Sequence, residues 1–165
     1  MKTIIISNIL SLIGEISNTI LPFLSTKKRM LLLQAITEIV FIVAYAVNGS
    51  FVLVALCIIV GLRNLYNAYL KSNFIVNILF LITGTLISIV VNTNGWLGIL
   101  PIICYIDYTI SIMITDNPQI LRWVILVNTI LYVIFNFGVM MYICFIFDII
   151  HLVTNSIAIW RYRKV

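Results

Sequence analysis

Long apolar stretches alternate along the chain with short polar or glycine-containing breaks. A helix needs about 20 mostly apolar residues to cross the hydrocarbon core of a bilayer. Breaks such as residues 25–29, 48–50 and 116–118 carry the glycine, proline, asparagine and serine that mark turns. The pattern predicts seven spanning helices, over residues 3–24, 30–47, 51–70, 73–91, 96–115, 119–137 and 139–160.

The apolar stretches are rich in isoleucine and valine, which favour strands in soluble proteins. In lipid the backbone polar groups must be satisfied within the segment, so a helix forms in spite of that preference. The strands of a membrane barrel would instead be alternating segments of about 10 residues. The expected fold class is therefore an all-α membrane protein.

Composition supports a chain that lies almost wholly within the membrane. Of 165 residues, 63% are hydrophobic and 9% are charged, whereas soluble domains carry about 25% charged residues. We expect a single transmembrane domain over residues 1–165, with the lipid bilayer as its main partner. The first apolar run is expected to be a retained helix, because no signal-peptidase site follows it.

The distribution of basic residues predicts the orientation. Seven spans place the termini on opposite sides, with Lys2 on one side and nine of the ten basic residues on the other. Those nine are Lys27, Lys28, Arg29, Arg63, Lys71, Arg122, Arg161, Arg163 and Lys164. Basic residues gather on the cytoplasmic face, so the N-terminus is expected outside and the C-terminus inside, and the net charge of +5 does not indicate nucleic-acid binding.

The helices are expected to form two parallel three-helix repeats, residues 1–70 and 96–165, joined by a connector helix at 73–91. A single connector gives both copies the same orientation in the membrane. Three pairs of polar residues recur at similar spacing: Glu15 and Asp107 (92 apart), Gln34 and Asn128 (94 apart), and Asn64 and Asn155 (91 apart). Chance matching among apolar helices remains the alternative.

Several motifs in the second half carry a resemblance to a known family. They are Leu100-Pro101, the pair Asn136 and Gly138, and Asp148, Asn155 and Arg161 at 7- and 6-residue spacing. On these residues the sequence resembles the YgjV-type family of small bacterial inner-membrane proteins over nearly its full length. The resemblance implies a multi-pass protein of the bacterial cytoplasmic membrane and no particular chemistry.

The predicted 3+1+3 arrangement also resembles the SWEET sugar facilitators and PnuC vitamin transporters. Asn64 and Asn155 lie on the third helix of each copy, as the SWEET asparagines do. The proline–glutamine dipeptide of that family is missing from the end of each first helix. The likeness is one of architecture, and a fold does not fix a function.

Polar side chains follow one face of most predicted helices, and four of the five acids lie within spans. Ionisable groups in lipid are costly and usually face the bundle interior or a wet cavity. The predicted substrate-binding residues are Glu15, Asn64, Asp148, His151 and Asn155. Asp148 and His151, three positions apart, could share a proton or bind a cation. The alternative is hydrogen bonding between helices, worth about 0.6 kcal/mol per contact.

Other candidate groups carry weaker signals. Arg63 is the only basic residue well inside a predicted span, and it either stays there or extends to the cytoplasmic surface. Cys57, Cys104 and Cys144 lack metal-ligand spacing and are expected to be small buried hydrophobes. No nucleotide-binding or hydrolase motif occurs, so we expect no catalytic site, metal or cofactor.

Three function classes are compatible with this pattern. The favoured one is a small-solute transporter or facilitator of SWEET-like build that handles a small polar solute. The alternative is a membrane accessory or immunity-type protein that acts through helix contacts with a partner; an intramembrane enzyme is the weakest of the three. Self-association is left open. A polar cavity at mid-depth would favour transport over a protein with a closed, dry interior.

Overall fold

A computed structural model describes residues 2–70 and 72–163. The described residues form seven α-helices and two 3-10 helices, with no strand among them, so the all-α prediction is confirmed. Lys71 and Lys164, two of the nine basic residues, lie outside the described residues. The elements are α1 (Lys2–Asn18), η1 (Leu21–Phe23), α2 (Lys27–Asn48), α3 (Phe51–Tyr69), α4 (Phe74–Val90), η2 (Gly95–Gly98), α5 (Ile99–Ile114), α6 (Pro118–Gly138) and α7 (Tyr142–Arg161).

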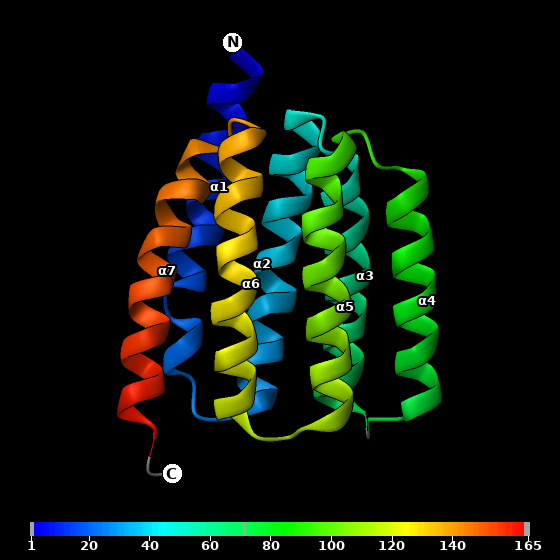
Figure 1. The fold of residues 1–165 in the computed structure, drawn as a ribbon, viewed down its shortest axis with the longest axis vertical. Coiled ribbons are helices and arrows are strands. Elements are labelled where there is room, and N and C mark those ends of the chain that lie inside the picture. The colour runs from blue at the N-terminus through cyan, green and yellow to red at the C-terminus, as the bar shows by residue number, and fades with distance from the viewer. Residues whose placement is uncertain (1, 71, 164–165) are drawn as a thin grey trace.

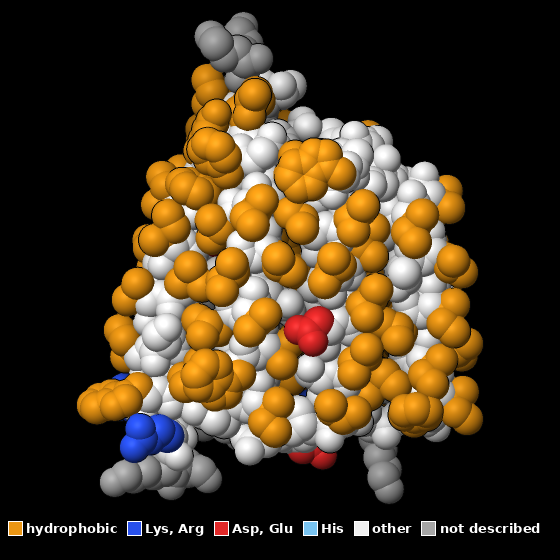
Figure 2. All heavy atoms as spheres, in the orientation of Figure 1, with side chains coloured by type: hydrophobic (Ala, Val, Ile, Leu, Met, Phe, Trp, Pro, Cys, Tyr) orange, Lys and Arg blue, Asp and Glu red, His pale blue; other side chains and the backbone are white. Residues whose placement is uncertain are grey.

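Six of the described segments are long and apolar enough to cross a membrane. The exception is α4, whose 17 residues span about 26 Å at about 1.5 Å per residue. Figure 1 shows α4 running beside the other helices, with the two termini at opposite ends of the bundle. Figure 2 shows hydrophobic side chains spread over the whole height of one face and basic side chains at the end that carries the C-terminus.

The first span, predicted over residues 3–24, covers Thr3–Phe23, but it is not one continuous α-helix. The α-helix ends at Asn18, and a turn leads into η1, which contains Pro22. Proline has no N–H to donate and its ring clashes with the preceding turn of an α-helix. The break allows the chain to bend just before α2, whose N-cap Thr26 accepts a hydrogen bond from the backbone N–H of Arg29.

The turn between α6 and α7 lies later than predicted. Gly138 is the last residue of α6, and the residue with left-handed backbone is Met140, at φ 62°. In the α2–α3 turn the left-handed residue is Gly49, at φ 80°. Gly138 instead packs closely against Leu97, since a Cβ there would lie 2.6 Å from a methyl carbon of that side chain.

Six helices form a closed ring, and α4 lies outside it. Neighbouring helices contact along α1–α2–α3 and α5–α6–α7, and the ring closes through contacts of α1 with α7 and of α3 with α5. The connector α4 contacts α3 and α5 (Figure 1). Asn67 and Asn77 exchange two amide hydrogen bonds, of 2.8 and 3.0 Å, that join α3 to α4.

Two clusters of buried hydrophobic residues fill the ends of the ring. The larger includes Ala44, Val52 and Met141, next to the α2–α3 and α6–α7 turns. The smaller includes Leu21 and Leu31 near the opposite end, where α2 begins. Between them, apolar residues of the larger cluster such as Phe41 and Leu56 share the middle of the ring with polar ones.

Candidate functional site: a cavity inside the ring

A cavity of about 190 Å³ lies inside the ring at mid-depth. All six ring helices and η1 contribute side chains to it, whereas α4 contributes none. For comparison, an engineered cavity of about 150 Å³ accommodates a benzene molecule. The space therefore suits a small solute or several waters.

Four of the five predicted site residues line this cavity: Glu15, Asp148, His151 and Asn155. Asn64 is fully buried but is not among the lining residues. Its Oδ1 accepts hydrogen bonds from Arg63 at 3.2 and 3.0 Å, and its Nδ2 donates to Gln34 Oε1 at 3.2 Å. Asn64 thus supports two lining residues from behind, and a substrate-binding role for the five stays a prediction.

The α1–α7 side of the cavity is acidic. Glu15 and Asp148 are 4% and 7% exposed. His151 Nε2 lies 3.8 Å from Glu15 Oε2, too far for a hydrogen bond. Asn136 Nδ2 donates to Asp148 Oδ2 at 2.8 Å, which orients that carboxyl group.

Three buried polar atoms on this side lack a hydrogen-bond partner among the described residues: Asn136 Oδ1, His151 Nε2 and Asn155 Oδ1. The amide nitrogen of Asn155 donates to the backbone oxygen of Arg122 at 3.0 Å, so its carbonyl oxygen faces elsewhere. Nearly all buried polar groups in proteins are paired with protein or ordered water. All three atoms belong to residues that line the cavity, so a polar group bound there could pair with them.

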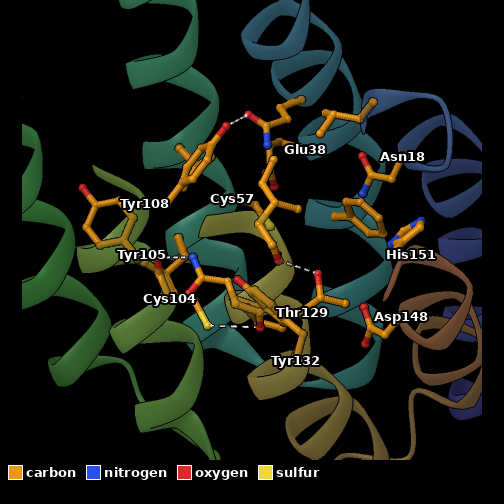
Figure 3. Close-up of a pocket in the computed structure, with 18 of the residues that line it drawn as sticks. Asn18, Glu38, Cys57, Cys104, Tyr105, Tyr108, Thr129, Tyr132, Asp148 and His151 are labelled. Atoms are coloured by element: carbon orange, nitrogen blue, oxygen red, sulfur yellow. Dashed lines mark hydrogen bonds between the residues drawn. The ribbon is translucent and has the colours of Figure 1, made fainter. Parts of the chain in front are cut away.

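The opposite side carries Arg63, which is 0% exposed. Its guanidinium donates to Asn64 and Thr109 and lies 5.4 Å from the ring centroids of both Tyr105 and Tyr108. Such cation–π contacts stabilise a desolvated cation. In Figure 3 Tyr105 and Tyr108 lie across the cavity from Asp148 and His151.

Sequence reasoning missed part of this site. The alternative in which Arg63 extends to the cytoplasmic surface is wrong, because its partners hold it inside the ring. Cys57 and Cys104 are buried, as predicted, but they also line the cavity. Both cysteines lie on the polar faces of their helices, which could have indicated that they line the cavity. Nothing in the sequence indicated this for Tyr105, since a tyrosine within a membrane more often packs against neighbouring side chains.

Asp107 behaves differently from the other intramembrane acids. It is half-buried and is not a lining residue of the cavity. Among the described residues, no group of three potential metal ligands occurs.

A ring of apolar helices around a cavity that contains several ionisable side chains is typical of a multi-pass membrane protein. The chain belongs to the bacterial inner membrane protein family Imp-YgjV, whose family model matches residues 5–165. It is therefore a protein of the bacterial inner membrane. No curated protein and no solved structure matches it.

Proposed function

We propose that this protein is a small-solute transporter or facilitator whose solute binds in the mid-depth cavity. The observation that carries the proposal is the cavity itself, with buried ionisable groups on both sides and three unpaired polar atoms among its lining residues. Ionisable groups within a membrane typically mark substrate or ion pathways. Polar residues that served only to join helices would be expected to pair with one another and leave no space.

We also propose that the ring consists of two parallel three-helix units joined by α4. Four lining residues of α2 correspond to four of α6 that lie 91 positions later: Gln34 with Ile125, Glu38 with Thr129, Phe41 with Tyr132, and Tyr45 with Asn136. Cys57 and Val60 of α3 correspond in the same way to Asp148 and His151 of α7. A constant offset across two helices is difficult to obtain by chance.

The turns repeat at the same spacing. Ser50 N donates to Tyr45 O at 3.0 Å, and Met141 N donates to Asn136 O at 2.9 Å. The left-handed residues described above, Gly49 and Met140, also lie 91 positions apart. In α1 and α5, the corresponding residues that line the cavity are Glu15 and Tyr105, which lie 90 positions apart. Asp107 is not the counterpart of Glu15 in this pairing, because it lies outside the cavity.

The same arrangement underlies the likeness to SWEET and PnuC proteins. Parallel repeats with a site near the midplane suit alternating access, in which one unit rocks against the other. The likeness is one of architecture alone, so it supports transport without indicating a solute.

The orientation is a separate prediction. A reporter fused after Val165 should be cytoplasmic, and one at the N-terminus should be outside. The described basic residues apart from Arg63 and the N-terminal Lys2 lie near the end of the bundle that carries the C-terminus, and such residues remain on the cytoplasmic side. Fusions that place both ends on one side would contradict an odd number of crossings.

Thiol labelling tests the cavity. In a chain whose only thiol is Cys104, a small membrane-impermeant thiosulfonate should react from at least one side, since a transport pathway must open to water. The matched control keeps only Cys144, which is equally buried but does not line the cavity; it should react at least about tenfold more slowly. Asn155→Cys in a cysteine-free chain should behave as Cys104 does.

Lack of reaction at both Cys104 and position 155, from either side, would contradict transport. The second candidate, a protein that acts through helix contacts, would then lead. One observation favours it, namely the half-exposed carboxyl group of Asp107 outside the cavity. In that case Asp107→Asn would impair function in cells, whereas changes within the cavity would not.

A further inference from the structure

The acidic side of the cavity carries several hydrogen-bond acceptors beside a single histidine. Asn136 and Asn155 each donate one amide N–H to an oxygen atom of the protein, the first to Asp148 and the second to the backbone of Arg122. Their free Oδ1 atoms are acceptors, and the carboxyl oxygens of Glu15 and Asp148 lie in the same cavity. An ammonium group, with three N–H donors and a positive charge, complements such a surface.

The opposite side offers unused donors. A guanidinium has five N–H groups, and Arg63 uses three of them on Asn64 and Thr109. One N–H remains on each terminal nitrogen, the pair that can bind the two oxygens of a carboxylate. Among the described residues, no carboxylate lies within salt-bridge distance of Arg63. A carboxylate entering from the cavity would satisfy both donors.

We infer that the cavity binds a small zwitterion, with its ammonium group against Glu15 and Asp148 and its carboxylate against Arg63. This inference rests on the proposed transport function and specifies its substrate class. Three lining carboxyl groups against one guanidinium disfavour a simple anion, and the unused Arg63 donors disfavour a simple amine. By comparison with benzene in a slightly smaller cavity, the volume suits a solute of about five to eight non-hydrogen atoms.

Binding is tested separately from transport, on the purified full chain. Calorimetric titration would compare glycine, β-alanine and γ-aminobutyrate, in which the same two charges lie progressively further apart, with propylamine, propionate and propane-1,3-diol. At least one zwitterion should bind about tenfold or more tightly than each of the other three, because only it satisfies both sides. The separation of the two charges in the zwitterion that binds most tightly then indicates the distance between the acidic side of the cavity and Arg63.

Two aspartate-to-asparagine variants, one within the cavity and one outside it, provide the control. Asp148→Asn should weaken binding of the preferred zwitterion about tenfold to hundredfold and leave propionate unchanged, because it removes one charge-assisted contact to the ammonium group. Asp107→Asn makes the same change in an intramembrane helix outside the cavity and should leave binding unchanged. Arg63→Gln should weaken the zwitterion and propionate; should this variant fail to fold, Asp148→Asn and the series still decide.

The outcomes separate the two proposals. Zwitterion binding without flux into proteoliposomes would support the binding site and overturn transport. Flux of the diol without tighter zwitterion binding would support transport and overturn the zwitterion. Equal effects of Asp148→Asn and Asp107→Asn, or no binding by any member of the series, would also overturn it.

Discussion

Arg122→Ala is expected to destabilise the protein by about 2–6 kcal/mol, because two carbonyl groups each lose a charge-assisted donor. Arg122 is 3% exposed and donates to Pro22 O and Leu24 O, both at 2.8 Å. It therefore fastens the interrupted end of the first crossing to α6. The guanidinium also lies 4.5 Å from the ring centroid of Tyr162. Thermal unfolding in detergent should show a loss of about 5–20 °C.

The chain offers a matched control for Arg122. Arg161 faces the same Tyr162 ring, at 5.8 Å from its centroid, but is exposed to the surroundings. Its replacement by alanine should cost little, because exposed interactions of this kind are weak. Equal unfolding temperatures for Arg122→Ala and Arg161→Ala would show that the bonds to residues 22 and 24 contribute nothing measurable.

Helix number and class followed from sequence because lipid allows few alternatives. A long apolar run in a bilayer must be a helix, and the glycine, asparagine and proline between runs gave most ends to within a few residues. The break at Asn18 was missed because Pro22 near a helix end is compatible with either a final turn or an interruption. The contacts that η1 makes with α2, α7 and Arg122 distinguish the two.

The cavity was partly predictable for a different reason. Helical periodicity identifies the face on which a residue lies, and Glu15, Asp148, His151 and Asn155 share the interior faces of α1 and α7. Periodicity does not give the direction of a long side chain, so the inward course of Arg63 could not be foreseen. Nor could it separate Asp107, at the edge of its polar face, from the three acids that line the cavity.

The end of the ring at the α2–α3 and α6–α7 turns is closed by contacts between the two proposed units. Asn48 Nδ2 donates to Val139 O at 3.3 Å, and these two residues lie 91 positions apart. Equivalent residues can meet only near the axis that relates two copies. Asn8 of α1 binds Met140 O and the N–H of Ile143.

Thr93, which precedes η2, contacts the other turn in a similar way. It donates to Gly49 O at 2.9 Å and accepts a hydrogen bond from the N–H of Phe51. The first unit therefore holds the α6–α7 turn through Asn8 and Asn48, and the segment that leads into the second unit holds the α2–α3 turn through Thr93. If solute passes through the cavity, these contacts must separate in each transport cycle.

A cross-link between the two turns is therefore expected to abolish transport. In a cysteine-free chain, Asn48→Cys with Val139→Cys, joined by a short bifunctional thiosulfonate, should reduce solute uptake into proteoliposomes more than about tenfold. A reductant should restore uptake, and either single cysteine should leave it unchanged. Binding of solute in detergent should survive, because the link lies away from the cavity-lining residues. Full uptake through the cross-linked chain would mean that this end of the ring is not part of the pathway.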